Sequence, residues 1–193
     1  MRTFYESEEL KNLGLKQYGE NVLISRNVIL YNPERLIIGN NVRIDDFTII
    51  GGKVTIGNYV HIAQFCGVYG GEEGIVMEDF SGLSSRVTIY ATSSDYSGES
   101  LTNPTVPAKY AKTDKNVLTT IKKHAIIGCG TVVLPGANVG VGCSVGAMSL
   151  VTRSLEDWGI YAGTPVKKLK ERSKHLLELE KQLWNEERNC ELK

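Results

Sequence analysis

The sequence lacks a net charge and a long apolar run. Its 193 residues contain 22 Lys and Arg against 22 Asp and Glu, so the chain has no electrostatic bias toward nucleic acid or an anionic membrane. No segment approaches the ~20 consecutive apolar residues of a transmembrane helix, and the first residues contain no apolar segment typical of a signal peptide. The sequence therefore predicts a cytoplasmic protein with no nucleic-acid partner and no membrane insertion.

Metal-ligand patterns are also scarce. The four cysteines form no Cys-x-x-Cys pair, and no His or Cys lies at zinc-site spacing from another. The three histidines, His61, His124 and His175, are widely separated along the chain. We therefore expect reduced thiols and no metal.

What the sequence does contain is a six-residue period. Apolar residues recur every sixth position, with a slip of two residues after Leu30, three extra residues after Val68 and 26 extra residues after Ile89. The seventeen positions are Ile24, Leu30, Ile38, Ile44, Ile50, Ile56, Ile62, Val68, Met77, Leu83, Ile89, Ile121, Ile127, Val133, Val139, Val145 and Val151. A period of six fits neither the 3.6 nor the 3.5 residues of helical repeats, so these residues are not one face of a helix.

A second series of smaller residues lies two positions before the first. Its clearest members are Val42, Thr48, Val54, Val60, Cys66, Ala125, Thr131, Ala137, Cys143 and Ser149. Residues two apart point to the same face of a strand. Each hexad therefore predicts a short strand with one small and one large inward side chain, and stacked strands of this kind form a parallel β-helix.

The pattern aliphatic-Gly-x-x-small-x, as in Ile127-Gly128-Cys129-Gly130-Thr131-Val132, resembles the hexapeptide-repeat acyltransferase family over roughly residues 20 to 170. The resemblance implies a left-handed triangular β-helix with three hexads per coil, hence between five and six coils. The ending Ala162-Gly163-Thr164-Pro165-Val166-Lys167 resembles the sugar acetyltransferase branch of that family.

The interruptions of the period divide the chain. Residues 1–20 are expected to hold a short helical segment that Ser7 caps and Gly14 ends. Residues 21–166 form the β-helix, from which the loop 90–118 protrudes. Residues 167–193 form a C-terminal helix, whose apolar stripe caps the solenoid or a neighbouring subunit. The stripe comprises Leu169, Leu176, Leu179, Leu183 and Trp184.

The resemblance to galactoside acetyltransferases also implies acetyl-CoA as co-substrate and a set of residues that contact it. Those positions fall on Cys129, Ala147, Thr152, Arg153, Lys167 and Lys170. The segment between Gly128 and Thr152 is poor in bulky side chains, which suits a narrow groove for the pantetheine arm.

Two residues are candidates for the base that removes a proton from the acceptor. His61 lies between two inward positions and must point outward, with Arg43 one coil before it and Gly82 one coil after. Asp95 lies in the protruding loop, beside the candidate substrate-binding residues Tyr96 and Asn103. An unperturbed imidazole suits a base at neutral pH, whereas a carboxylate near its ordinary pKa suits an amine acceptor better than a hydroxyl.

The predicted activity is acetyl-CoA-dependent O-acetylation of a sugar acceptor in polysaccharide biosynthesis by a homotrimer. The alternative is N-acetylation of a nucleotide-linked amino sugar. It is left open because Ser94 and Phe65 stand where galactoside acetyltransferases carry their catalytic His and acceptor-binding Asn. A non-catalytic scaffold is a more remote alternative. The γ-class carbonic anhydrases share the fold, but their zinc-binding histidines are not matched here.

Overall fold

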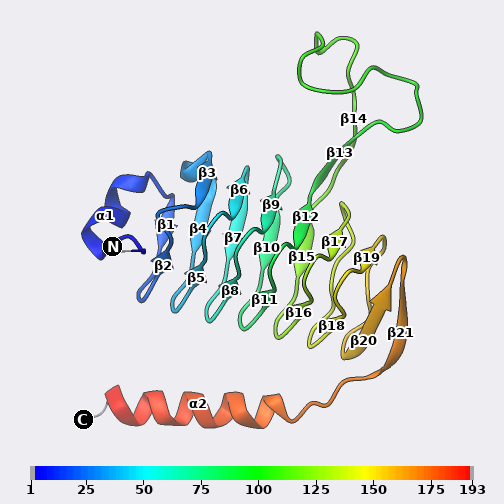
Figure 1. Ribbon diagram of the computed structural model, residues 1–193. Helices are drawn as coiled ribbons and strands as arrows, with labels where there is room; N and C mark the ends of the chain where they lie inside the picture. The colour runs from blue at the N-terminus through cyan, green and yellow to red at the C-terminus, as the bar shows by residue number, and fades with distance from the viewer. Residues whose placement is uncertain (1–2, 192–193) are drawn as a thin grey trace.

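The computed structural model describes residues 3–191, and short parallel strands stacked along one axis make up most of it (Figure 1). Sheet I contains β1 (Gln17–Tyr18), β4 (Leu36–Ile38), β7 (Val54–Ile56), β10 (Ile75–Met77) and β15 (Thr119–Ile121). Sheet II contains β2 (Leu23–Ile24), β5 (Arg43–Ile44), β8 (His61–Ile62), β11 (Gly82–Leu83), β16 (Ile126–Ile127), β18 (Ser144–Val145), β20 (Gly159–Gly163) and the antiparallel β21 (Val166–Glu171). Sheet III contains β3 (Ile29–Tyr31), β6 (Ile49–Gly51), β9 (Gly67–Tyr69), β12 (Thr88–Tyr90), β17 (Val132–Val133) and β19 (Leu150–Val151).

The two inward series of the sequence form the core of this β-helix. Every residue of the apolar series is buried except Leu30, which is half-buried, and every residue of the smaller series is buried. Burial of small and large side chains in alternation fills the interior of the triangular prism without voids. The predicted left-handed parallel β-helix is confirmed.

The solenoid is longer than the seventeen hexads predict. Among the described residues, sheet II has seven parallel rungs from β2 to β20, so the prediction of five to six coils is too low. The missed rungs carry tyrosines: Tyr18 pairs with Ile38 in sheet I, and Tyr161 pairs with Val145 in sheet II. A pattern of aliphatic residues at every sixth position does not include these two tyrosines, so it misses their rungs.

The N-terminal helix differs in detail from the expectation. Helix α1 (Ser7–Leu10) continues into a 3-10 turn (Lys11–Leu13) that ends at Gly14, whose φ is 72°. Ser7 is the first helical residue and not the cap. Glu6 is the cap, and its side chain and that of Glu9 bond reciprocally to each other's backbone N–H. Since β1 begins at Gln17, the solenoid starts within residues 1–20. A second 3-10 turn, Pro33–Arg35, accounts for the slip after Leu30.

The protruding loop leaves the prism between β12 and β15. Its stem is an antiparallel pair, β13 (Thr92–Ser94) and β14 (Thr113–Asn116), and its tip stands far out from the solenoid (Figure 1). The register of the prism is unbroken beneath the loop, because Met77 pairs directly with Ile121.

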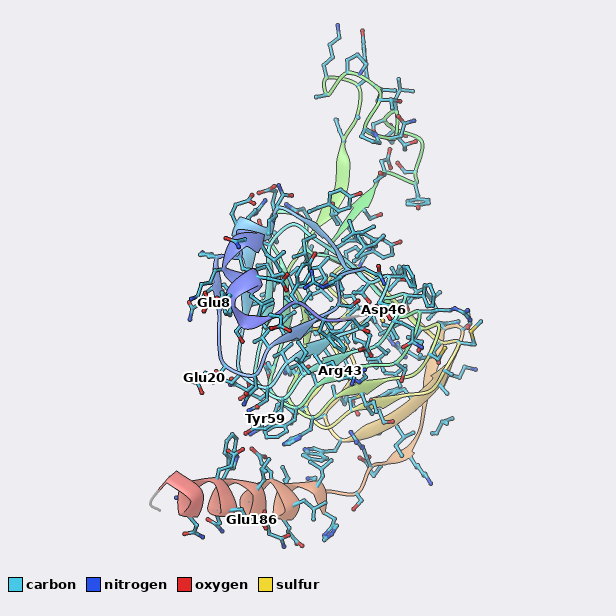
Figure 2. The ribbon with its side chains drawn as sticks, turned by 60° about the vertical axis from the view of Figure 1, so that its left-hand side comes forward. Glu8, Glu20, Arg43, Asp46, Tyr59 and Glu186 are labelled. Carbon is cyan, nitrogen blue, oxygen red and sulfur yellow. The ribbon has the colours of Figure 1, made fainter. Side chains whose placement is uncertain are left out.

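The C-terminal helix begins later than residue 167, because residues 166–171 form β21 and Leu169 is exposed there. Helix α2 (Leu176–Glu191) lies along the corner between sheets I and II (Figure 1). Trp184 meets the stacked rings of Tyr59 and Phe80 edge-on, at centroid distances of 5.5 and 5.8 Å. Tyr59 points toward the helix (Figure 2) and donates to Glu187.

A half-buried carboxylate completes this contact. Glu180 accepts from Lys123 Nζ at 2.5 Å and from Trp184 Nε1 at 3.0 Å, and lies 2.8 Å from His124 Nε2. Burial raises the pKa of Glu180, but the hydrogen bonds outweigh it and hold the pKa at about 2. Because this value is below that of the unfolded chain, the ionised carboxylate stabilises the docked helix above the unfolded pKa, and the contribution is lost as pH falls toward 2.

We predict that Glu180→Gln destabilises the protein at pH 7 by roughly 1.5–3 kcal/mol, the usual contribution of hydrogen bonds to a charged group. The difference in the free energy of unfolding between the variant and the unsubstituted protein becomes smaller as pH falls below about 4.5, where the carboxylate of the unfolded chain becomes protonated. Denaturant unfolding followed by Trp184 fluorescence at several pH values measures this. Glu178→Gln, on the exposed side of α2, is the control; an equal effect of both variants would contradict the prediction.

Candidate functional site

The turn between sheets II and III repeats along the molecule as a straight corner. In five successive coils, one residue adopts a φ of 54–70° and donates its N–H to a carbonyl of the previous coil at 2.8–3.2 Å. These residues and their preceding neighbours are, from the N-terminal end, Asp46–Phe47, Gln64–Phe65, Ser85–Arg86, Cys129–Gly130 and Ala147–Met148. We refer to this column as the II–III corner.

Two of the residues predicted to contact CoA occupy the C-terminal half of this corner. Cys129 and Ala147 lie on successive coils, since the N–H of Met148 donates to the Cys129 carbonyl at 2.8 Å. At Gly128 a Cβ atom would lie 2.5 Å from the Ala147 nitrogen, so the coils approach too closely there for any side chain. This part of the corner is lined by backbone, by the small side chains of Cys129 and Ala147, and by the exposed side chain of Met148.

Two predicted cations lie at the end of the same corner. In the hairpin of β20 and β21, Lys167 pairs with Ala162 and Lys170 with Ile160. Both lysine side chains are exposed. Lys168, between them, forms ion pairs with Glu156 and Glu171, whereas Lys167 and Lys170 form none with the residues that the structure describes. Their charges are therefore available to an anionic ligand.

Thr152 and Arg153 lie elsewhere. They follow β19, at the turn that leaves sheet III, and both are exposed. The structure of one chain therefore does not gather all six predicted CoA-contacting residues: Cys129, Ala147, Lys167 and Lys170 follow the II–III corner, and Thr152 and Arg153 lie across sheet III from it.

His61 points outward from β8, as predicted. Its Nε2 lies 2.8 Å from Asp45 Oδ2, and the other oxygen of Asp45 accepts from Arg43 Nε at 2.7 Å. Burial raises the pKa of Asp45, but His61 and Arg43 lower it more, so the carboxylate is held ionised. This contact fixes the orientation of the imidazole. The register places Arg43 and Gly82 on the coils before and after His61, as expected.

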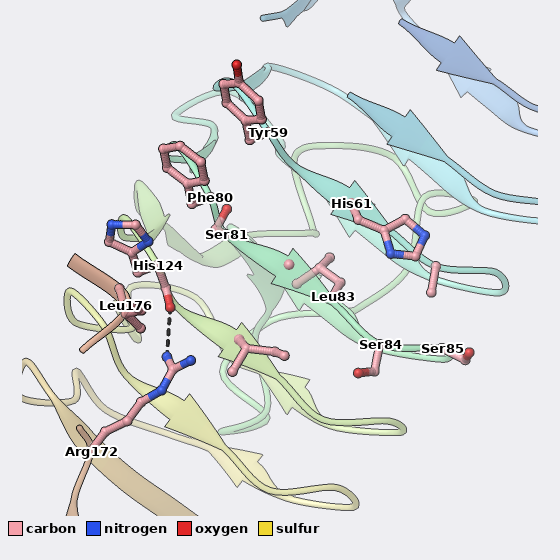
Figure 3. A pocket seen from close by; sticks show the side chains of 13 residues that line it. Tyr59, His61, Phe80, Ser81, Leu83, Ser84, Ser85, His124, Arg172 and Leu176 are labelled. Atoms are coloured by element: carbon pink, nitrogen blue, oxygen red, sulfur yellow. Dashed lines mark hydrogen bonds between the residues drawn. The ribbon is translucent and has the colours of Figure 1, made fainter. Parts of the chain in front are cut away.

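His61 lines a cavity of about 480 Å³ on the outer face of sheet II (Figure 3). Gly82 forms its floor, where a Cβ atom would have only the His61 carbonyl within 4 Å, at 3.7 Å. Ser84 and Ser85 lie at the end next to the II–III corner. The opposite end is closed by Arg172, which donates to the His124 carbonyl at 2.8 Å.

Asp95 follows β13 at the base of the protruding loop. Its carboxylate accepts four hydrogen bonds from its own turn, from the N–H and hydroxyl of Ser97 and of Ser100, at 2.6–3.1 Å. The bonds from Ser97 contribute most to lowering the pKa of Asp95 to about 2. At neutral pH it is therefore an anion and a hydrogen-bond acceptor, with little tendency to take up a proton.

The two predicted substrate-binding residues are separated. Tyr96 is 92% exposed and lines a cavity of about 890 Å³ between the loop stem and sheet III, together with Tyr69 and Tyr90. Asn103 lies farther out on the loop, where its side-chain oxygen accepts from the N–H and hydroxyl of Thr105. Within one chain His61 and Asp95 are likewise apart: His61 lines the cavity on sheet II, whereas Ser94 and Tyr96, the neighbours of Asp95, line the cavity beside sheet III.

Sequence reasoning missed Asp45 and Ser85. Asp45 lies two residues after the outward residue Arg43. Its carboxylate reaches the His61 ring only because successive coils stack on each other. Ser85 lies in the II–III corner between the small residues Cys129 and Ala147 on one side and the aromatic residues Phe65 and Phe47 on the other. The sequence could have indicated Ser85, because it occupies the same position in its hexad as the predicted CoA-contacting residue Cys129.

Neither a metal cluster nor a membrane span occurs in the part of the chain that the structure describes. No three or more His, Cys, Asp or Glu side chains are grouped there so as to hold a metal ion. No helix within residues 3–191 has the length and apolar character needed to cross a bilayer.

Comparison with known proteins places these features in a family. Residues 36–70 match the family model for bacterial transferase hexapeptide repeats. The chain is 40% identical over 180 residues to dTDP-4-amino-4,6-dideoxy-D-glucose acyltransferase from Escherichia coli, which covers 92% of this chain and 93% of that protein.

Solved structures of AntD, an N-acyltransferase from Bacillus cereus, superpose on almost the whole chain. Its complex with dTDP and 3-hydroxybutyryl-CoA has a TM-score of 0.94 and 48% identity, and covers 97% of this chain and 100% of that one. A variant bound to dTDP-4-amino-4,6-dideoxyglucose and coenzyme A has a TM-score of 0.93 at 48% identity, over 96% of this chain and 99% of that one. With relatives of this identity along nearly its full length, the chain belongs to the hexapeptide-repeat acyltransferase family.

Proposed function

We propose that this protein transfers an acyl group from an acyl-CoA to the amino group of a dTDP-linked 4-amino-4,6-dideoxy sugar in the cytoplasm. The observation that carries the proposal is the similarity, over more than nine-tenths of the chain, to relatives named for that acceptor. The comparisons thus support the N-acylation alternative better than the O-acetylation that the sequence led us to expect.

The donor is expected to lie along the C-terminal half of the II–III corner. The small surface at Cys129 and Ala147 suits the pantetheine arm, and Lys167 and Lys170 suit the phosphates of CoA. This direction brings the thioester toward Ser85, the next residue of the corner. An N–H group or the hydroxyl of Ser85 would then stabilise the oxyanion of the tetrahedral intermediate.

Two residues of this chain match positions replaced in the relative. The serine and the aspartate replaced in the AntD structures are ten residues apart in that protein. Ser85 and Asp95 are a serine and an aspartate with the same spacing here, which supports a role for both at the acceptor.

The chemistry requires little from a base. The neutral amine attacks the thioester carbonyl and forms the C–N bond of a tetrahedral intermediate, whose collapse then breaks the C–S bond. The amine nitrogen loses a proton, and the thiolate of CoA gains one. An ionised Asp95 suits orientation of the amine and stabilisation of its developing positive charge. His61, held by Asp45, remains the candidate for accepting the proton.

We further propose a homotrimer. The outer face of sheet III exposes apolar and aromatic residues from several coils, and such surfaces mark contacts with other chains. The residues are Ile29, Tyr31, Ile49, Tyr69, Tyr90 and Leu150. Packing along this face would bring the protruding loop of one subunit, with Asp95, toward the II–III corner of the next.

Acceptor specificity provides the direct test. We expect dTDP-4-amino-4,6-dideoxyglucose to be acylated with release of CoA thiol, and the matched sugar with a hydroxyl at carbon 4 to be inert, because the amine is the stronger nucleophile. Thiol release and product mass measure this with acetyl-CoA and 3-hydroxybutyryl-CoA as donors. Transfer to the hydroxyl sugar alone would restore O-acylation, and transfer to neither would refute the proposed acceptor.

Lys167→Ala is expected to weaken acetyl-CoA binding about five-fold, the effect of removing roughly 1 kcal/mol of ion pairing at an exposed site. Titration calorimetry measures this. Lys181→Ala, an exposed lysine on α2, is the matched control. Equal affinities of the two variants would place the CoA phosphates elsewhere.

His61→Asn and Asp95→Asn are each expected to lower kcat by about 10²-fold, typical of a lost acid–base or charge-stabilising group, while acetyl-CoA affinity is kept. His175→Asn, which removes an exposed histidine whose Nδ1 lies 3.0 Å from Glu178, should leave kcat unchanged. Normal turnover by both site variants would mean that the substrate itself delivers the proton to solvent.

A further inference from the structure

The N-terminal half of the II–III corner presents two aromatic rings to solvent. Phe47 and Phe65 stack with their centroids 5.2 Å apart and their planes 17° from parallel. They are 53% and 51% exposed. Neighbouring apolar rings left in water are a feature of binding surfaces, and flat rings are the surfaces on which nucleobases stack.

An arginine extends the same stack. The Arg86 guanidinium lies 5.8 Å from the centre of the Phe65 ring, and its backbone N–H bonds to the Gln64 carbonyl of the previous coil at 3.1 Å. Among residues 3–191, Arg86 makes no ion pair with a carboxylate, in contrast to Arg35 and Arg43. A guanidinium that lies on an aromatic ring and keeps its donors free is well suited to phosphate oxygens.

The rings also border a cavity of about 450 Å³, which Phe4, Arg43 and Gln64 help to line. It contains two carboxylates, and both are engaged. Asp45 is paired with Arg43 and His61, and Asp46 accepts from Ser25 Oγ and from Asn27 Nδ2. The carboxylate charge facing an incoming anion is therefore partly neutralised, and the Gln64 amide is left as a polar group suited to a base edge.

We propose that this half of the corner binds the nucleoside diphosphate of the acceptor, an inference that rests on the proposed function. The pyrimidine base stacks on the Phe47–Phe65 pair, and Arg86 binds the diphosphate. Phe65 and Phe47 are one and two coils from Ser85, hence about 5 and 10 Å away at the usual strand spacing. The hexose attached to the diphosphate at carbon 1 then carries its carbon-4 amine toward Ser85.

This assignment uses one straight column for both substrates. At the corner position with positive φ, the coils of the acceptor half carry the aromatic residues Phe47 and Phe65, whereas the coils of the donor half carry Gly130 and Met148. Ser85 lies between the two halves. The side chains of the corner thereby specify which half takes which substrate.

The test compares Phe65→Leu with Phe65→Tyr and Arg86→Gln in the full-length protein. Calorimetry gives the affinity for dTDP and, separately, for CoA, and steady-state kinetics gives the KM for the amino sugar. Leucine keeps the apolar bulk but loses the aromatic face, so Phe65→Leu should weaken dTDP binding roughly ten-fold or more. Phe65→Tyr should bind dTDP as the unsubstituted protein does, and CoA affinity should be unchanged in all three.

Salt dependence separates the two contacts. Arg86→Gln should reduce the dependence of dTDP affinity on salt concentration, because a phosphate contact is lost, whereas Phe65→Leu should leave that dependence unchanged. If the unsubstituted protein binds dTDP but Phe65→Leu and Arg86→Gln bind it equally well, the nucleotide lies elsewhere and only this inference fails. If the unsubstituted protein binds no dTDP, the proposed acceptor class fails with it.

Discussion

The structure depends on the hydrogen bonds that join each coil to the next. Two inward side chains per hexad hold the strands at the right radius, and the N–H and C=O groups of every rung then meet those of the rung one coil away. Most corners close because one residue in the turn adopts a positive φ, and several of these are bulky residues such as Phe47, Tyr59 and Arg86. Such backbone is costly for residues with a side chain, so the stacking on either side must outweigh the cost.

The functional surfaces are consequences of this stacking. Because every coil repeats the same geometry, outward residues at equivalent positions form straight columns. The II–III corner is one such column and carries both proposed subsites. The corner between sheets I and II is another, where Tyr59 and Phe80 receive Trp184 and so position α2.

The sequence was sufficient for most of the fold and for only part of the site. A strict period of six leaves few architectures, so the prism, the loop and the terminal helix were predictable. The first and last rungs were missed because Tyr18 and Tyr161 do not follow the aliphatic pattern. The contacts of outward side chains were not predictable: His61 was correctly placed outside, but its bond to Asp45 depends on the offset of stacked coils, and the bonds that saturate Asp95 depend on the path of its loop.

The continuous pairing of β10 with β15 beneath the protruding loop has a consequence for how such enzymes diversify. Since Met77 pairs with Ile121 as if the 26 residues inserted after β12 were absent, the loop can change in length and sequence while the pairing of the core is kept. The prism can therefore keep its II–III corner constant while the insertion, which carries Asp95 and Tyr96, is exchanged. Specificity for new acceptors can therefore evolve by exchange of the protruding loop as a unit, which is joined to the prism by one covalent junction at each end.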